Sequence, residues 1–164
     1  MRSIPVLLIA LGLPFLGACA GTSAPTGGNQ ANFVAIAPAL PLYPNETPEL
    51  RQLINTYADL YDVPRPLVHK VIIRESTHRP WARNGPYYGL MQILPATARG
   101  MGFRGDASDL LDAETNLKYA VKYLRGAWLL ADGDYDTAVK WYARGYYYEA
   151  KRRGMLVETG LRAG

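Results

Sequence analysis

One glutamate stands where the helical periodicity predicts an apolar side chain. Val68, Val71 and Ile72 lie seven, four and three residues before Glu75, which is the spacing of a single helical face. A carboxylate on such a buried face is costly unless it is paired or protonated. Burial also raises a carboxyl pKa toward the range that suits a general acid. The residue types and their spacing therefore predict acid–base chemistry at Glu75.

The alternative is that Glu75 is a helix-end carboxylate that turns to solvent or pairs with Arg74 or Arg79. Its surroundings favour chemistry, because no further Asp or Glu occurs for 30 residues, until Asp106. Residues 65–104 carry seven Lys and Arg against one acid, a net charge of +6. Nearby arginines lower a carboxyl pKa while burial raises it, and the sequence alone leaves open which effect dominates.

Three aromatic residues, Trp81, Tyr87 and Tyr88, follow in a loop rich in Gly, Pro and Tyr. Such side chains offer a flat apolar face that suits sugar rings, and they serve equally well as core anchors. Because it directly precedes Gly89, we expect Tyr88 to contact a substrate, with core packing as the equal alternative. His69 and His78 lack metal-ligand spacing, so we expect them to be surface or internally satisfied residues. The sequence therefore predicts neither a metal site nor a cofactor.

The elements that position these residues are predicted to be helices. Pro48 starts one helix, Pro64 and Pro66 open the second, and a short turn covers residues 95–99. Asp112 and Asp134 are expected caps of two later helices, the first ended by Gly133 and the second with Ala138, Val139, Tyr142 and Tyr146 on one face. No clear alternating strand pattern occurs, and residues 96–164 lack proline. We expect an all-α, or mostly α, fold with one core.

The N-terminal 44 residues differ from the rest of the chain. Residues 1–18 have the pattern of an export signal: a positively charged N-terminus, an apolar run from Ile4 to Leu16, and small residues before the expected cleavage site. Leu16-Gly17-Ala18-Cys19 resembles the lipobox of bacterial lipoproteins, which implies a lipidated Cys19 and a membrane anchor. Residues 19–44 are uncharged and rich in small and turn-forming residues, so we expect a tether, with the folded domain at residues 45–164.

Three sequence motifs closely resemble those of the soluble-lytic-transglycosylase (SLT) domain family. They are Glu75-Ser76, then Gly89-Leu90-Met91-Gln92-Ile93, then Pro95-Ala96-Thr97-Ala98. The resemblance spans residues 47–154 and implies a lysozyme-like helical fold that acts on peptidoglycan glycan strands. A later family motif, Ala-Tyr-Asn-x-Gly, aligns with residues 141–145, where Tyr142 and Gly145 match and Ala143 replaces the asparagine.

The resemblance implies that Glu75 acts first as acid and then as base, which leaves a 1,6-anhydro sugar end without the use of water. It further implies that Gln92 contacts the substrate and that the Tyr142 hydroxyl positions the carboxyl group. Ser76 and the backbone from Gly89 to Met91 are expected to shape the cleft. Two alternatives stay open: a lysozyme-type hydrolase on the same fold, and a non-catalytic wall-binding lipoprotein.

The composition excludes several other classes. With 164 residues, 49% of them hydrophobic, the chain has enough apolar content for one core. A single cysteine excludes an intramolecular disulfide framework. The net charge of +4 falls to +3 once the signal is removed, and we expect it to suit an acidic wall polymer rather than nucleic acid.

We expect the protein to be a monomer, held at the periplasmic face of the outer membrane.

Overall fold

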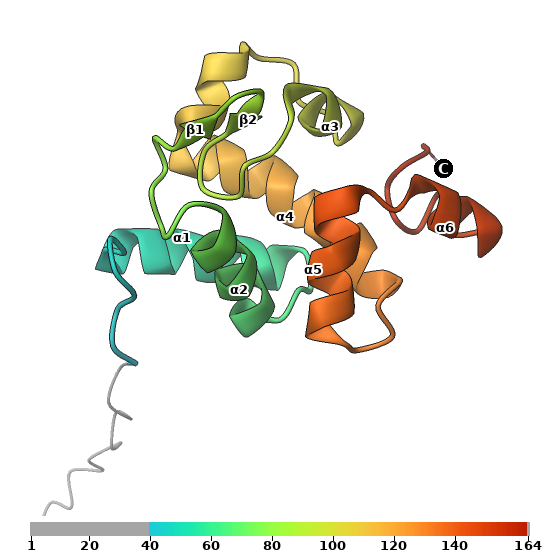
Figure 1. The fold of residues 1–164 in the computed structure, drawn as a ribbon, viewed down its shortest axis with the longest axis horizontal. Coiled ribbons are helices and arrows are strands. Elements are labelled where there is room, and N and C mark those ends of the chain that lie inside the picture. The colour runs from blue at the N-terminus through green and yellow to red at the C-terminus, as the bar shows by residue number, and fades with distance from the viewer. Residues whose placement is uncertain (1–39, 164) are drawn as a thin grey trace, which may run out of the picture. The chain divides into compact units, whose positions relative to one another are not determined.

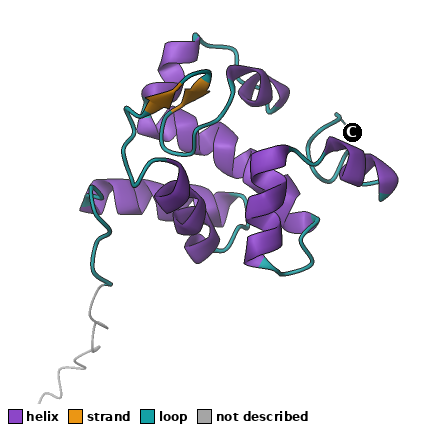
Figure 2. Cartoon of the chain, in the orientation of Figure 1, coloured by secondary structure: helices purple, strands orange, loops and turns teal. Residues whose placement is uncertain are grey.

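The computed structural model describes residues 40–163, and this part of the chain is mostly helical, as predicted. Its elements in chain order are α1 (Pro48–Leu60), α2 (Arg65–Glu75), β1 (Arg83–Asn84), β2 (Tyr87–Tyr88), α3 (Pro95–Gly100), the 3-10 helix η1 (Ala107–Leu111), α4 (Ala113–Leu129), α5 (Tyr135–Arg144) and α6 (Tyr147–Arg152) (Figures 1 and 2). The expected signal peptide, Cys19 and tether residues up to 39 lie outside the described residues. Between residues 40 and 163, no helix is both long and apolar enough for a membrane span.

The helix starts follow from their capping residues. The carboxylates of Asp112 and Asp134 accept hydrogen bonds of 2.7 Å from the amides of Thr115 and Thr137, which confirms both as caps of α4 and α5. The hydroxyl of Thr47 accepts from the amide of Leu50 at the start of α1. Each cap satisfies an amide that the helix itself leaves without a partner.

Two expected helix ends were wrong. Helix α4 ends at Leu129, and Gly133 lies beyond it in the turn to α5, with φ at 88°. Helix α5 ends before Gly145, whose φ of 84° lies outside the helical range, so Tyr146 is not on the same helix as Tyr142. Tyr146 is nevertheless buried and belongs to the hydrophobic core.

Helix α4 forms the centre of the core (Figure 1). It packs against α1, α3 and α5, while α2 packs against α1 and α5. Leu117, Val121 and Leu124 on α4 have no exposed surface, and neither have Val71 and Ile72 on α2. Burying such side chains stabilises the fold by roughly 1.5–3 kcal/mol each. The apolar faces therefore fix the C-terminal end of α2 against the rest of the core.

A short β-hairpin covers one side of this helical core (Figure 2). The sequence did not predict it. Strands β1 and β2 pair antiparallel, with Arg83 opposite Tyr88 and Asn84 opposite Tyr87. Gly85 takes a positive φ of 57° in the connecting turn. Strands of two residues are too short to show an alternating pattern, which is why the sequence did not indicate them.

Candidate active site

An open cavity of about 560 Å³ lies beside the C-terminal end of α2. Its walls come from five parts of the chain: the end of α2, the hairpin, α3 with the segment before it, helix α4, and the end of α5. The lining residues are Arg74, Glu75, Asn84, Tyr87, Gln92, Ile93, Leu94, Thr97, Tyr123, Tyr142, Ala143, Arg144 and Gly145. Among these lining residues, all within the described part of the chain, Glu75 is the only carboxylate. The cavity therefore offers one acid and two arginines to whatever it binds.

Glu75 is the last residue of α2, and its side chain is 23% exposed. Burial raises its carboxyl pKa, and the positive charge of Arg74 opposes this increase. The Arg74 Nε lies 3.5 Å from Glu75 Oε1. The net direction is upward, so burial dominates over the arginine, which answers the question that the sequence left open. A carboxyl group with a raised pKa holds its proton over a wider pH range, as a general acid requires.

Ser76 joins the end of α2 to the turn formed by residues 89–92. Its hydroxyl donates a 2.7 Å hydrogen bond to the main-chain oxygen of Leu90 and accepts a longer one from the amide of Arg79. Its side chain is buried, so it does not line the cavity. Ser76 therefore acts as a structural link that fixes the residue next to Glu75.

Gly89 makes the closest backbone approach in this turn. Its φ is 74°, and a Cβ atom added there would lie 2.2 Å from the Leu110 carbonyl oxygen and 2.3 Å from Asn116 Nδ2. Only glycine fits both the conformation and the space. The backbone of Gly89 thus lets this turn lie close against Leu110 and Asn116.

Asn116 fastens the same turn to α4, and the sequence reasoning missed it. Its Nδ2 donates 2.8 Å hydrogen bonds to the main-chain oxygens of Tyr88 and Leu110, and its Oδ1 accepts one of 3.0 Å from the amide of Met91. Its side chain is fully buried. The available signal was an amide directly beside the apolar face of α4, because a buried polar group requires hydrogen-bond partners.

Gln92 lines the cavity, while Met91 is buried and contributes only through its backbone. The Gln92 side-chain nitrogen donates to the main-chain oxygens of Ala82 and Gly89, at 3.0 and 2.8 Å. Its side-chain oxygen accepts no hydrogen bond from residues 40–163 and stays available to a ligand. The backbone at Gln92 has a φ of 47°, which is uncommon for a residue with a side chain and typical of functional sites.

Tyr142 lines the cavity, but its hydroxyl is used differently from the expectation. It donates a 2.8 Å hydrogen bond to the main-chain oxygen of Met91 instead of positioning the Glu75 carboxyl. Burial, with the negative charge of Glu75 as a smaller cause, raises the pKa of Tyr142 well above its usual range. Tyr142 is therefore neutral and close to Glu75, and its hydrogen bond to Met91 holds the cavity wall in place.

Of the two alternatives for Tyr88, the structure favours core packing, and its neighbour Tyr87 faces the cavity. Adjacent residues on a strand point to opposite faces. The Tyr88 ring packs against the core beneath the Arg83 guanidinium, which lies 4.8 Å from the ring centroid. Tyr87 is 43% exposed and lines the cavity.

Residues near the end of α5 complete the cavity. Ala143, at the position of the family asparagine, is exposed and lines the wall, so this position faces the cavity even though the amide is missing. Arg144, also in the lining, lies over the Trp141 ring at 3.9 Å. Tyr147 and Tyr148 are exposed on α6 and do not line the cavity.

The two histidines, expected to be surface or internally satisfied residues, are brought together by the fold. His69 Nδ1 lies 3.1 Å from His78 Nε2, and both rings are buried beside Glu46. The sequence did not indicate this pair because His78 lies beyond the end of α2, where helical spacing no longer predicts which side chains meet.

The comparison with known families supports the assignment of the cavity. The family model described as Transglycosylase SLT domain matches residues 52–153, which contain every residue that lines the cavity. No solved structure matches the chain. The fold is the mostly helical, lysozyme-like fold expected of this family. The chain therefore belongs to the transglycosylase SLT domain family, and its function is of the peptidoglycan-acting, lytic transglycosylase type.

Proposed function

We propose that this protein is a lytic transglycosylase that cleaves the β-1,4 bond between MurNAc and GlcNAc and leaves a 1,6-anhydro-MurNAc end. The observation that carries the proposal is the single carboxylate in the cavity lining, Glu75. Hydrolytic glycosidases usually need two carboxyl groups, one as acid and one as base or nucleophile. One carboxyl group suffices when the substrate supplies its own nucleophile.

In the first step protonated Glu75 gives its proton to the glycosidic oxygen. The bond between MurNAc C1 and that oxygen breaks, and GlcNAc leaves with the proton on its 4-hydroxyl. The N-acetyl carbonyl oxygen of MurNAc stabilises the electron-poor C1. The raised pKa of Glu75 favours this step, because it keeps the carboxyl group protonated at higher pH.

In the second step ionised Glu75 takes the proton from the MurNAc 6-hydroxyl, whose oxygen bonds to C1. The proton returns to Glu75, so the enzyme is restored and no water is consumed. The attacking hydroxyl belongs to the same sugar, and such an intramolecular attack gains much of its rate from proximity. Arg74, at 3.5 Å, stabilises the carboxylate between the two steps.

The remaining lining residues support binding of an acidic polysaccharide. Arg74 and Arg144 offer positive charge to the carboxylates of the peptide stems, or to the lactyl carboxylate of a muramic acid that carries no stem. Tyr87 offers an exposed ring to a sugar face, and the Gln92 side-chain oxygen can accept a hydrogen bond from a sugar hydroxyl.

We further propose that the chain is an exported lipoprotein, held through a lipid at Cys19 on the periplasmic face of the outer membrane. The support is the signal pattern of residues 1–18 and the lipobox-like residues 16–19. Metabolic labelling with a fatty-acid probe tests it: the wild type should become labelled and Cys19→Ser should not.

Digestion of purified sacculi tests the enzymatic proposal. The account predicts soluble fragments with anhydro ends, which are lighter by one water than the fragments of a hydrolase. Reducing muramic ends would favour a lysozyme-type hydrolase. Binding to sacculi without solubilisation would favour a wall-binding lipoprotein, an alternative that the missing amide at Ala143 keeps open.

A further inference from the structure

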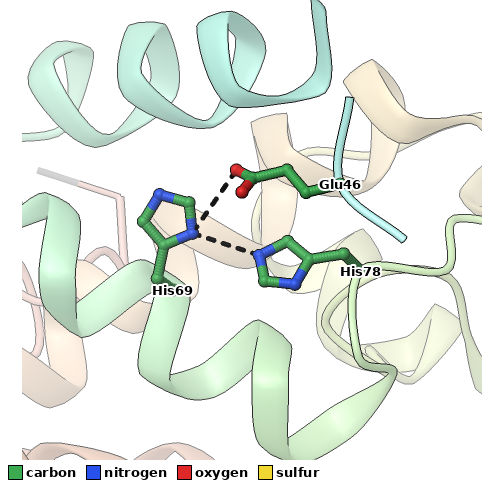
Figure 3. A group of neighbouring side chains, drawn as sticks. All are labelled: Glu46, His69 and His78. Carbon is green, nitrogen blue, oxygen red and sulfur yellow. Dashed lines mark hydrogen bonds and ion pairs between the residues drawn. The ribbon is translucent and has the colours of Figure 1, made fainter. Parts of the chain in front are cut away.

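A second group of functional side chains lies apart from the cavity, where the segment before α1 meets α2. Glu46, His69 and His78 each bring one ligand-type atom to a common point, and these atoms lie within 4.8 Å of one another (Figure 3). None of the three residues lines the cavity that contains Glu75. All three are buried, with exposed fractions of 7%, 6% and 0%.

The distances suit coordination to one ion. His69 Nδ1 lies 3.1 Å from His78 Nε2 and 3.8 Å from Glu46 Oε1. Two nitrogen ligands of a tetrahedral zinc ion, each at 2.0–2.1 Å from the metal, lie about 3.3 Å apart. The separation from Glu46 is too long for a hydrogen bond. The three atoms therefore converge, but only the two histidine nitrogens lie within hydrogen-bond distance of each other.

The ligand types also suit a cation at this point. Imidazole nitrogen and carboxylate oxygen are both zinc ligands in proteins. The side chain of Glu46 has no exposed surface and that of His69 is 8% exposed, so both ligand groups are held inside the fold. Neutral imidazole and ionised carboxylate are the forms that bind metal.

The surrounding chain builds this site in a conformation that costs energy. Thr77 and His78 both have positive φ, at 52° and 57°, and Asn45 donates a hydrogen bond to the Thr77 carbonyl oxygen. Such strained backbone persists where surrounding contacts fix it and is found at ligand clamps. The Tyr43 ring stacks on His78 at 5.1 Å and covers the cluster.

We propose that Glu46, His69 and His78 form a binding site for a divalent transition-metal ion, with Zn²⁺ as the best match to two imidazoles and one carboxylate. The ion joins three separate pieces of chain: the segment before α1, helix α2 and the loop that follows Glu75. It stabilises the link between the N-terminal segment and the domain and takes no part in the reaction. Arg51, which holds both oxygens of Glu46, orients that ligand from outside the coordination shell.

Zinc titration of the full chain, stripped of metal with a chelator, tests the proposal. We expect one zinc ion per chain by calorimetry and elemental analysis, together with an increase in Tm. The chain has only two histidines and one cysteine, so Cys19→Ser should bind as the wild type does. His69→Gln and His78→Gln should lose the zinc-dependent increase in Tm, while Glu158→Gln, an exposed carboxylate elsewhere, should keep it.

Nitrogen NMR of the histidine rings decides the question even where a variant fails to fold. Zinc should shift Nδ1 of His69 and Nε2 of His78 in the wild-type protein, since these are the converging atoms. Failure of the wild type to bind zinc, or binding that leaves both rings unshifted, would overturn the proposal. Neither readout requires turnover, so the result is independent of the proposed enzymatic function.

Discussion

The hydroxyl of Tyr142 donates a 2.8 Å hydrogen bond to the main-chain oxygen of Met91, 51 residues away in the chain. This bond fastens α5 to the turn at residues 89–92, while Ser76 fastens the same turn to the end of α2. The two contacts hold together the walls on either side of Glu75. The position of the acid therefore depends on buried hydrogen bonds as well as on apolar packing.

Removing the hydroxyl in Tyr142→Phe should lower the free energy of unfolding by about 1–3 kcal/mol, because the buried Met91 carbonyl loses its partner. Urea unfolding of the purified protein measures the change. Tyr123→Phe is the matched control, since the neighbouring Tyr123 hydroxyl makes no hydrogen bond with residues 40–163. Equal losses in the two variants would contradict the role given to Tyr142.

Gly89→Ala should be among the most destabilising single substitutions, at more than about 4 kcal/mol, because the added methyl group overlaps Leu110 and Asn116. Gly85→Ala is the control. Gly85 also has a positive φ but has no atom within 4 Å of the added carbon, so its cost should be the conformational one alone, roughly 1–2 kcal/mol. Thermal or urea unfolding compares the two, and similar stabilities would argue against the close approach at Gly89.

Arg74→Gln should shift the pH profile of kcat/KM. As a general acid Glu75 must be protonated, so activity falls as the pH rises through its pKa. Arg74 lowers that pKa, and its removal should move the falling limb to higher pH. Arg99→Gln, on α3 and outside the cavity lining, should leave the limb unchanged. A shift to lower pH in Arg74→Gln would contradict the assigned electrostatics.

Ala143→Asn should increase kcat/KM on sacculi, because it restores an amide on the cavity wall at the position where the family motif has asparagine. A new hydrogen bond to a sugar contributes about 0.5–1.5 kcal/mol, which corresponds to a several-fold gain. Ala143→Leu separates the amide from added bulk. Equal kinetics for the asparagine variant and the wild type would show that this position makes no substrate contact.

The helical fold was predictable because its signals are local. The caps at Asp112 and Asp134 and the prolines at the helix starts need only neighbouring residues to act. The apolar spacing before Glu75 likewise indicated a carboxylate at a partly buried place on α2. These features depend on contacts within one or two helical turns.

What could not be predicted depends on contacts between distant parts of the chain. Asn116 acts on a turn that lies 25 residues before it, and His69 meets Glu46 through the arrangement of α1 and α2. The hydrogen-bond partner of the Tyr142 hydroxyl and the choice between substrate contact and core packing at Tyr88 also depend on such distant contacts. Which tyrosine side chains line the cavity depends on how the hairpin and the end of α5 pack in the folded chain.

The most direct test of the central claim is mass spectrometry of sacculi digested by the wild type and by Glu75→Gln. The account predicts anhydro-muramic ends with the wild type and a loss of turnover of about 10²–10⁴-fold or more in the variant, with an unchanged circular dichroism spectrum. Glu158→Gln, an exposed glutamate outside the cavity, should retain wild-type products. Reducing ends from the wild type, or undiminished turnover by folded Glu75→Gln, would contradict the account.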